Sequence, residues 1–498
     1  MQNLNESLQA KYPHLELAVL SLSQVNKDNE SKRIDSEYFK KEYLENEQII
    51  SKFECKTLEQ LSTRITNGHT PYGENLQENE VKLITAEFID DFLINEVKKF
   101  ISFESHLNYL KRSILKNGDI IFSIKGKVGN AVPIFDIKEP LNINQDVAKI
   151  SLKADINHFY VSAFLNSKYG KKQTEAQATG QINPFIALGV LRNLKIPLFP
   201  KPFQLEIEKL VKQSHEALED SKRLYKEAQE LLYKELELDF KNPLKSLLKS
   251  SLQAKKASEL AIINDISKKY PHLNISVRPL SKSLHKSGRL DSEYYQSKYD
   301  LMETKIKSFS HKKLGELVSI QKSIEPGSEA YQDEGIEFVR VANLGKFGLS
   351  KSDIYLNEQD FSKELKKLAP KKETILLSKD GSIGISYCLE EDLECITSGA
   401  ILHLKVKDKG EILPQVLSLI LNSIVVKLQA ERDAGGSIIA HWKISEIEKV
   451  LIPLFDFKLQ EQIALKIQQS FTLRAKSKDL LQNAKMRLEN AIENFCDI

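Results

Sequence analysis

Apolar residues recur at alternating spacings of four and three residues in two long stretches of the chain, 203–240 and 457–498. This is the spacing of the a and d positions of a heptad, and it predicts two long helices that bury a continuous seam. Arg474 stands where the first stretch has Leu218, and its neighbour Leu473 is expected to cover that turn. Several seam positions are small; the seam comprises Ile207, Val211, Ser214, Leu218, Ser221, Tyr225, Ala228 and Leu232 in the first stretch and Ile463, Ile467, Ser470, Ser477, Leu481, Ala484 and Leu488 in the second.

The two helical stretches are part of a larger internal repeat. Arg33-Ile34-Asp35-Ser36-Glu37-Tyr38-Phe39 is answered 256 residues later by Arg289-Leu290-Asp291-Ser292-Glu293-Tyr294-Tyr295. Similar offsets separate three further pairs of segments: 11–15 and 269–273, 126–129 and 381–384, and 196–199 and 452–455. A nearly constant offset over four landmarks predicts one duplicated unit of about half the chain.

The regions before the two helices carry a different pattern. Short β-type runs alternate there with turn signals, for example at 81–85 and 120–124 in the first region and at 336–341 and 374–377 in the second. Helical stretches are mixed among them, at 158–166 and 413–428. Because no regular strand–helix alternation is sustained, the expected fold class is α+β rather than a repeated βαβ arrangement.

These patterns predict two duplicated α+β domains joined by two long helices. If the two halves are related by a two-fold axis, the helices run antiparallel and pair; the alternative is that each helix folds back on its own domain. The predicted boundaries are 1–200 for a leading segment and the first domain, 203–240 for the central helix, 241–268 for a linker, 269–455 for a second leading segment and domain, and 457–498 for the C-terminal helix.

Composition changes this picture little. Seventy-two Lys and Arg residues face 69 Asp and Glu residues, so the net charge of +3 gives no nucleic-acid signal, although a local basic stripe stays open. Four cysteines in 498 residues suit a reducing compartment. The longest apolar stretch, 416–426, is too short to span a membrane, and the first residues do not form a signal peptide. We therefore expect a cytoplasmic protein without a membrane partner.

Several motifs stand in a fixed order along the chain. They are a G-x-T-P turn at 67–71, a hairpin strand at 118–123 with a G-x-x-G turn behind it, a strand at 335–344, and a closing Ile-Pro-Leu-Phe at 452–455 followed by Gln-Glu-Gln-Ile-Ala at 460–464. In this order the chain resembles the specificity subunit of Type I restriction-modification systems, which has two target-recognition domains separated by long helical spacers. The resemblance covers nearly the whole chain.

The sequence departs from that family in three places. The second copy has Glu325-Pro326-Gly327-Ser328 where G-x-T-P is expected, and the first has Gln204-Leu205-Glu206-Ile207 in place of the Glu-Gln box. The leading segments, about 1–45 and 258–305, are longer than those of a minimal subunit. They leave open a variant related to Type IIB or IIG systems.

The sequence argues against catalysis, since the nuclease-like Glu-x-Lys triplets at 54–56 and 80–82 are expected by chance in a chain with 28% charged residues. An adenine methyltransferase would need an Asn/Asp-Pro-Pro-Tyr/Phe loop, and the nearest string, Asn183-Pro184-Phe185, lacks the second proline. No G-x-x-x-x-G-K-[ST] phosphate loop is present. The G-x-x-G turns follow strands and favour hairpin turns over phosphate sites. Cys388 and Cys395 do not have zinc-ligand spacing. We therefore expect neither catalytic residues nor a metal site.

Polar and basic residues in the loops are candidates for contacts with DNA. Lys and Arg neutralise phosphates, whereas Arg, Asn, Gln, Ser and Thr can also reach base edges. The alternative for any one of them is an ordinary exposed or turn-forming residue. The candidates in the first domain are Arg64, Asn67, Thr70, Tyr72, Lys125, Lys127, Gln145, Thr179, Gln181 and Asn183, and those in the second are Gln321, Lys322, Ser323, Lys379, Asp380, Ser382, Ser437, His441 and Lys443.

The resemblance implies a non-catalytic subunit in which each domain recognises one half of a bipartite, asymmetric site in double-stranded DNA. Helices of about 32 residues, about 48 Å long, would set the two readers more than one DNA turn apart. It also implies two methyltransferase subunits that use S-adenosylmethionine, and a motor-nuclease restriction subunit that uses ATP and Mg²⁺. This chain is expected to bind no cofactor itself. The alternatives are a scaffold that holds proteins on a helical rod, and a phosphate-handling enzyme.

Overall fold

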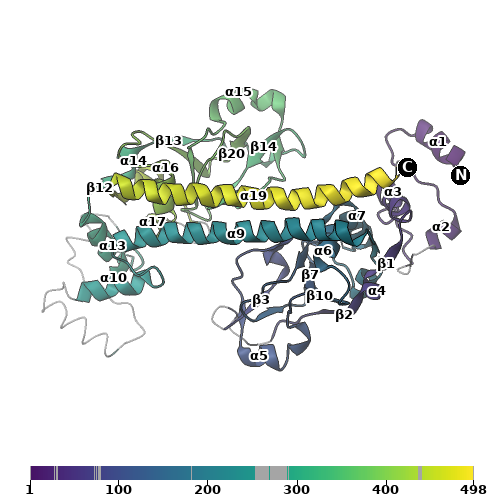
Figure 1. The fold of residues 1–498 in the computed structure, drawn as a ribbon. Helices are drawn as coiled ribbons and strands as arrows, with labels where there is room; N and C mark the ends of the chain where they lie inside the picture. The colour runs from purple at the N-terminus through teal and green to yellow at the C-terminus, as the bar shows by residue number, and fades with distance from the viewer. Residues whose placement is uncertain are drawn as a thin grey trace. The chain divides into compact units, whose positions relative to one another are not determined.

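The computed structural model describes residues 2–26, 29, 32–71, 73, 76, 80–180, 182–252, 269, 289, 291–435 and 440–496. The chain divides into two compact units. The first unit comprises Met1–Leu218 and Ala475–Ile498, and the second comprises Glu219–Arg474. Each unit therefore contains one mixed α/β domain together with part of both long helices (Figure 1).

The first unit is built on a four-stranded antiparallel sheet in the order β2-β10-β7-β8. Ala148 of β10 lies between Asn67 of β2 and Phe122 of β7 in the register of the sheet. Strand β7 is also central, and all five of its residues are buried: Ile120, Ile121 and Phe122 are apolar, and Asp119 accepts a hydrogen bond from Ser151 Oγ. The strands are β2 (Ser62–Asn67), β7 (Asp119–Ser123), β8 (Ala131–Pro133) and β10 (Val147–Leu152).

A second, three-stranded sheet in the order β6-β3-β9 completes this domain. Its strands are β3 (Val81–Ile84), β6 (Phe100–Ile101) and β9 (Leu141–Ile143), and β3 runs parallel to β9. Helix α6 (His158–Asn166) packs on β8 and is buried over eight of its nine residues. Its polar Asn157 caps the helix by accepting the backbone N–H groups of residues 159 and 160.

The second unit repeats this topology strand for strand. Its four-stranded sheet has the order β13-β21-β18-β19, and its three-stranded sheet has the order β17-β14-β20 with β14 parallel to β20. The strands are β13 (Val318–Lys322), β14 (Ile336–Val339), β17 (Tyr355–Leu356), β18 (Ile375–Ser378), β19 (Ser386–Cys388), β20 (Cys395–Thr397) and β21 (Ile401–Val406). The predicted duplication and the mixed fold class are confirmed.

Short strand pairs close each domain where its chain enters and leaves. Strand β1 (Cys55–Thr57) pairs with β11 (Lys195–Pro197), and β12 (His311–Lys313) pairs with β22 (Leu451–Pro453). The two Ile-Pro-Leu-Phe segments therefore return the chain to the start of their own domain, directly before a long helix. Two hairpins complete the strands: β4 (Ile89–Asp90) with β5 (Leu93–Ile94), and β15 (Leu344–Gly345) with β16 (Gly348–Leu349).

The other helices are short and lie at the margins of the sheets. The predicted helix at 413–428 is two helices, α16 (Pro414–Leu421) and α17 (Ile424–Asp433), because Asn422 ends the first and Ser423 caps the second. The remaining described helices are α1 (Gln2–Lys11), α2 (Leu22–Asn26), α3 (Lys41–Ile50), α4 (Leu58–Leu61), α5 (Phe103–Leu107), α7 (Lys168–Gln177), α8 (Leu188–Arg192), α10 (Pro243–Leu252), α13 (Ser297–Lys307), α14 (Leu314–Leu317), α15 (Glu358–Leu368) and α18 (Ile444–Ile447).

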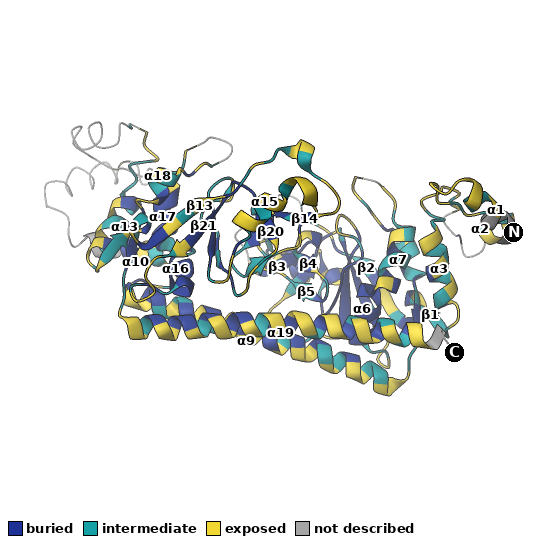
Figure 2. Ribbon diagram, turned by 90° about the horizontal axis from the view of Figure 1, so that it is seen from above, coloured by how far each residue is buried: buried dark blue, intermediate teal, exposed yellow. Residues whose placement is uncertain are grey.

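The two longest helices are α9 (Lys201–Glu235) and α19 (Phe457–Cys496), and they pair antiparallel within each unit (Figure 1). In the first unit, Ser214 Oγ lies 2.8 Å from Ser477 Oγ, and in the second, Ser221 Oγ lies 3.0 Å from Ser470 Oγ. Every predicted seam residue other than Arg474 is buried, while exposed residues follow the outer faces (Figure 2). The predicted pairing of the helices is confirmed.

The turn around Arg474 differs from the prediction. Phe471 rather than Leu473 enters the core of the second unit, where it faces the ring of Tyr225. The Arg474 guanidinium lies 3.9 Å from the ring centroid of Phe347, so an aromatic side chain of the domain covers this charge. Burial lowers the pKa of Arg474. The heptad pattern did not include Phe347 because this residue comes from a distant part of the sequence.

Two sequence predictions fall largely outside the described residues. Of the linker predicted at 241–268, the structure describes α10 and no residue after 252. Of the second Lys-Tyr-Pro-His-Leu segment it describes Lys269 alone. Among the described residues, no helix is long and apolar enough to cross a membrane.

His403, in strand β21, is a buried histidine that the fold keeps neutral. It is 5% exposed, and its Nε2 lies 2.8 Å from Thr397 Oγ1. Burial lowers its pKa from 6.5 to about 4. Between these two values the unfolded chain binds more protons than the folded chain, so the free energy of unfolding falls as the pH drops through that window.

We expect His403→Gln, which keeps a hydrogen-bonding group next to Thr397, to remove this contribution of up to about 3 kcal/mol to the pH dependence. Fluorescence of Trp442, the single tryptophan and a buried residue of the second unit, reports the unfolding. Urea unfolding of the full chain at about pH 7 and about pH 4.5 measures the difference. His14→Gln, at an exposed histidine of the first unit, is the control. An unchanged pH dependence in His403→Gln would contradict this account.

Candidate nucleic-acid interface

Loops distant in the sequence meet at one end of the four-stranded sheet in the first unit. The segment after β2 contacts the β9–β10 turn: Gly68 N donates to Asn144 O over 3.1 Å, and Asn67 Nδ2 donates to Gln145 O over 3.3 Å. Thr70 Oγ1 donates to Gln145 Oε1 over 2.8 Å. Three predicted contact residues, Asn67, Thr70 and Gln145, are therefore brought together.

The close approach of these two segments requires a glycine. A Cβ at Gly68 would lie 1.7 Å from the carbonyl oxygen of Ile143. In the second unit, Ser323 is the first residue after β13, Ile324 is bridged to Ser398, and a glycine lies on the opposite segment, at Gly399 before β21. Gly399 N donates to Glu325 Oε2 over 3.0 Å. In the register of β10 and β21, Gly399 stands where the first unit has Gln145.

The β7–β8 and β18–β19 turns carry the two G-x-x-G motifs. Ser123 Oγ donates to Lys127 O, and Ser378 Oγ donates to Ser382 O in the same way. Each serine also accepts a backbone N–H, 3.0 Å from residue 130 and 2.9 Å from residue 385. The glycines have positive φ, which a tight turn requires. The prediction that these motifs are hairpin turns is confirmed.

A third segment joins each turn. Thr179 and Phe185 exchange two backbone hydrogen bonds of 2.8 Å, and Gly126 N donates to Pro184 O over 3.1 Å. In the second unit, Gly435 and His441 exchange bonds of 3.1 and 2.7 Å, and Gly381 N donates to residue 440 over 2.9 Å. The pairs Thr179–Phe185 and Gly435–His441 are therefore held beside the G-x-x-G turns by the same backbone pattern.

In the second unit, a carboxylate lies among these loop contacts. Lys379 Nζ pairs with Asp380 Oδ2, and His441 Nδ1 lies 2.9 Å from Asp380 Oδ1. Burial alone would raise the pKa of Asp380, but hydrogen bonds from Lys379 and His441 lower it below its usual value. The equivalent position in the first unit is Lys125, since Lys125 pairs with Phe185 as Asp380 pairs with His441. The two units thus differ in charge at one matched position.

Several of the other predicted contact residues also lie on these loops. Lys127 is exposed in the G-x-x-G turn, and Asn183 is exposed in the segment that joins it. Lys322 lies beside Gly399 in the second unit, and Lys443 is exposed directly after Trp442.

Some predicted residues lie elsewhere. Ser323 is 7% exposed, and its Oγ has no hydrogen-bond partner among the residues that the structure describes, so this side chain does not belong to the loop surface. Gln321 Nε2 reaches Lys367 O, at the end of α15, over 3.5 Å. Tyr72, Gln181 and Ser437 lie outside the described residues.

Arg64 faces a separate polar pocket of about 500 Å³ beside β2 and β10. Lys116 and Lys149 line the same pocket. Lys149 Nζ donates to Ile114 O over 2.8 Å, and burial lowers the pKa of this lysine. Within the described ranges, no group of three or more His, Cys, Asp or Glu residues is placed to hold a metal ion.

Sequence reasoning missed Glu325, Gly399 and Ile182. Ile182 is 93% exposed on the segment that joins the first G-x-x-G turn, an unusual position for an isoleucine. Gly399 could have been found by aligning the two halves, because it stands opposite Gln145 once the strands β10 and β21 are superimposed in register. Glu325 had no such signal, since its role depends on Gly399 lying across from it.

A family model for the Type I restriction modification DNA specificity domain matches two parts of the chain, residues 26–228 and 306–483. The chain belongs to this family. The resemblance seen in the sequence is therefore confirmed. The two matched segments correspond to the two copies of the internal repeat.

Two curated relatives are specificity subunits. The chain is 33% identical over 101 residues to the specificity subunit of the Type I restriction enzyme MjaVIII from Methanocaldococcus jannaschii, a match covering 19% of this chain and 24% of that protein. It is 21% identical over 223 residues to the specificity subunit of the Type I restriction enzyme EcoBI from Escherichia coli, covering 42% of this chain and 46% of that protein. The matches thus span less than half of either relative.

Solved structures similar to the chain include two S subunits of Type I systems. The S subunit from M. genitalium has a TM-score of 0.39 and 13% identity over 88% of this chain and 95% of that one. The HsdS subunit from Thermoanaerobacter tengcongensis has a TM-score of 0.28 and 15% identity over 88% of this chain and 96% of that one.

The glycine at the loop contact gives a direct test of the geometry. We expect Gly68→Ala to destabilise the first unit by about 3 kcal/mol, because the new Cβ would collide with backbone rather than with a movable side chain. Gly399→Ala should cost less, since its nearest neighbour is the end of the Glu325 side chain at 3.1 Å. Gly189→Ala, which meets nothing within 4 Å, is the control.

Calorimetry of the full chain measures the three effects. The expected order of destabilisation is Gly68→Ala first, then Gly399→Ala, then Gly189→Ala. Equal stability of Gly68→Ala and Gly189→Ala would contradict the close approach of residues 68 and 143.

Proposed function

We propose that the chain is the DNA sequence-recognition subunit of a restriction-modification complex, without catalytic residues of its own, and that each unit recognises one half of a bipartite, asymmetric site. The observation that carries this proposal is that the loops of the two units make the same backbone contacts but carry different side chains. The same three loop contacts are built twice, but Lys125 is matched by Asp380, Gln145 by Gly399, and Thr179 by Gly435. Two surfaces of one design that differ in donors, acceptors and charge are suited to two different base sequences.

The side chains in the first unit offer both kinds of DNA contact. Lys125 and Lys127 are exposed in the G-x-x-G turn and can neutralise phosphates. The amides of Gln145 and Asn183 can pair with an adenine edge through a donor and an acceptor. The Gln145 amide is held by Thr70, which fixes the acceptor before DNA arrives. This half of the interface therefore combines a positioning charge with directional groups.

The second unit offers a different set of contacts. Asp380 is an acceptor suited to the exocyclic amine of cytosine, and His441 lies against it. Lys322 and Lys443 supply positive charge near the same loops. Because Lys379 is neutralised by Asp380, we propose that this half relies less on phosphate contacts than the first half does.

The helix pair is proposed to set the distance between the two half-sites. Helix α9 has 35 residues, which correspond to about 52 Å at 1.5 Å per residue. One turn of DNA is about 34–36 Å, so a helix of this length exceeds the spacing of two adjacent turns of the groove. Unread base pairs would then lie between the two recognised blocks.

We further propose that two methyltransferase subunits and a motor-nuclease subunit assemble with this chain. Exposed apolar side chains on the long helices support protein docking there, namely Leu205, Phe457, Leu465 and Met486. In this proposal S-adenosylmethionine, ATP and Mg²⁺ bind in the partner subunits and not in this chain.

An exchange of one domain tests the half-site proposal. Residues 55–197 begin and end on the paired strands β1 and β11, so they can be replaced by the equivalent domain of another family member without cutting a sheet. Selection from random duplex DNA, with the co-encoded methyltransferase subunits present, should change one block of the recognised site and leave the other unchanged. Exchange of the equivalent segment 311–453 should change the other block.

Two results would contradict the proposal. A change in both blocks on exchange of one domain would show that the units do not read separate half-sites. Absence of any selected motif for the wild-type complex would favour a scaffold that binds only proteins.

A further inference from the structure

The repeated segments 33–39 and 289–295 agree in five of seven residues, although the loop side chains of the two units have diverged. We call these segments the leading turns. They belong to the leading segments, outside the two sheets, and nothing in the proposed DNA contacts uses them. The structure describes all of the first leading turn and residues 289 and 291–295 of the second.

Each leading turn is held by the same internal contacts. Arg33 donates to both oxygens of Asp35 over 2.8 and 2.6 Å, and Asp35 Oδ1 accepts Tyr38 N over 3.1 Å. In the second turn the corresponding distances are 2.7, 2.9 and 3.0 Å. The guanidinium also lies over the tyrosine ring, at 5.1 Å in the first turn and 4.6 Å in the second. The shared residues are therefore those that build a rigid turn.

The first leading turn contacts the end of helix α7. Arg33 Nη1 donates to Ala176 O over 3.2 Å and to Ala178 O over 3.0 Å, and Gln177 Nε2 donates to Tyr38 Oη over 3.0 Å. Carbonyl groups at a helix C-terminus lack partners within the helix and carry the negative end of its dipole, so a guanidinium is well suited to this position. The next residue is Thr179, where the segment that joins the G-x-x-G turn begins.

The second leading turn reaches the matching end of α17 through different chemistry. The ring of Tyr294 has Arg289 on one side at 4.6 Å and Arg432, in the last turn of α17, at 5.8 Å. Arg432 is fixed by Glu303 at 3.0 Å and by Asp433 at 2.9 Å. Gly435, two residues further on, is paired with His441. Both leading turns thus contact the end of a helix, α7 or α17, and each of these helices leads into the residues that pair beside the G-x-x-G turn of its unit.

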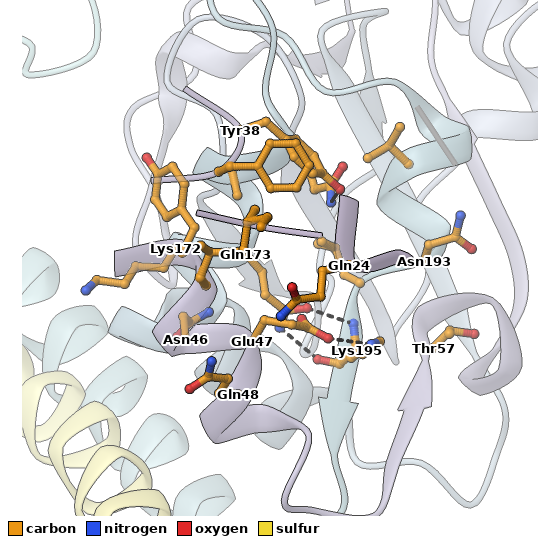
Figure 3. Close-up of a pocket in the computed structure, with 18 residues that line it drawn as sticks. Gln24, Tyr38, Asn46, Glu47, Gln48, Thr57, Lys172, Gln173, Asn193 and Lys195 are labelled. Carbon is orange, nitrogen blue, oxygen red and sulfur yellow. Dashed lines mark hydrogen bonds and ion pairs between the residues drawn. The ribbon is translucent and has the colours of Figure 1, made fainter. Parts of the chain in front are cut away.

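Helix α7 is fixed elsewhere by contacts that do not involve the leading turn. Gln173 and Lys195 of β11 exchange hydrogen bonds of 2.9 and 3.0 Å, and Glu47 of α3 pairs with Lys195 at 2.5 Å (Figure 3). A pocket of about 490 Å³ separates these residues from parts of the leading segment, including Tyr38. The leading turn therefore holds the C-terminal end of α7 by a few directed hydrogen bonds, while its flank is held independently.

We infer that Arg33 and Arg289 are positioning residues that hold the backbone pairs Thr179–Phe185 and Gly435–His441 in place for base recognition, each in its own unit. This inference rests on the proposed function. Loss of the arginine should release the backbone at Thr179 or Gly435 while leaving the sheet intact. Recognition of one half-site should then weaken, and recognition of the other half-site should not change.

Arg33→Ala and Arg289→Ala test this inference in the full chain. In Arg33→Ala, amide hydrogen exchange at Thr179 and Phe185 should become about tenfold faster, as expected for loss of charged hydrogen bonds, while Ile121 and Ile150 in the sheet keep the wild-type rate. Arg289→Ala should act in the same way on Gly435 and His441. Arg33→Lys keeps the charge but loses the fork of donors, so it should resemble Arg33→Ala.

The same variants are then assayed by DNA selection with the methyltransferase subunits present. Arg33→Ala should relax the block assigned to the first unit by the domain exchange, and Arg289→Ala the block assigned to the second. Arg112→Ala, at an exposed arginine of the first unit, is the matched control and should leave both blocks unchanged.

Each outcome separates the inference from the proposed function. If the wild-type complex selects no motif, the proposed function fails, whatever the exchange rates show. If it selects a bipartite motif while Arg33→Ala leaves loop exchange and both blocks as in wild type, the positioning role is wrong. Faster exchange throughout the sheet in both Arg33→Ala and Arg33→Lys would also overturn it, because the arginine would then stabilise the whole unit.

Discussion

Each unit is closed by part of α9 packed antiparallel on part of α19, and four buried serines lie opposite each other in this pairing. An apolar seam alone permits neighbouring registers, whereas a buried hydroxyl away from its partner costs about 1–3 kcal/mol. The hydrogen-bonded pairs Ser214–Ser477 and Ser221–Ser470 therefore favour one register. Seam residues also belong to the core of each domain, since Ile207 and Leu488 pack with the first domain and Tyr225 and Ile463 with the second. A change of register would disturb both cores.

In the loops of each unit, the backbone contacts and the variable side chains are subject to different constraints. The backbone contacts of the first unit need a glycine at position 68, where a Cβ would collide with the carbonyl of Ile143, whereas Gly399 of the second unit lies against the end of the Glu325 side chain. The loop backbone also needs a serine inside each G-x-x-G turn. The matched positions Lys125 and Asp380 do not face these demands and have diverged. This separation explains how one loop design can serve two recognition surfaces.

Features set by local patterns could be predicted from the sequence. The helix seam follows from periodic spacing, and the G-x-x-G turns follow from glycines between strands, so the helices, the hairpins and the duplication were predicted correctly. Exposure of single loop residues depends on contacts between distant segments. Ser323 is covered, and Arg64 faces a separate pocket, because the neighbours that decide this lie far away in the sequence. The covering of Arg474 by Phe347 is a similar case.

Disulfide trapping across the helix pair tests the antiparallel register most directly. In the full chain with Cys496→Ser, the double variants Ser214→Cys/Ser477→Cys and Ser221→Cys/Ser470→Cys are oxidised, and Ser214→Cys/Ser470→Cys is the mismatched control. Burial raises the pKa of Cys55 to about 11 and that of Cys395 to about 12, so these native thiols should react slowly. The account predicts a disulfide within one chain for both matched pairs and none for the control. Disulfides that join two chains, or equal trapping of the mismatched pair, would contradict it.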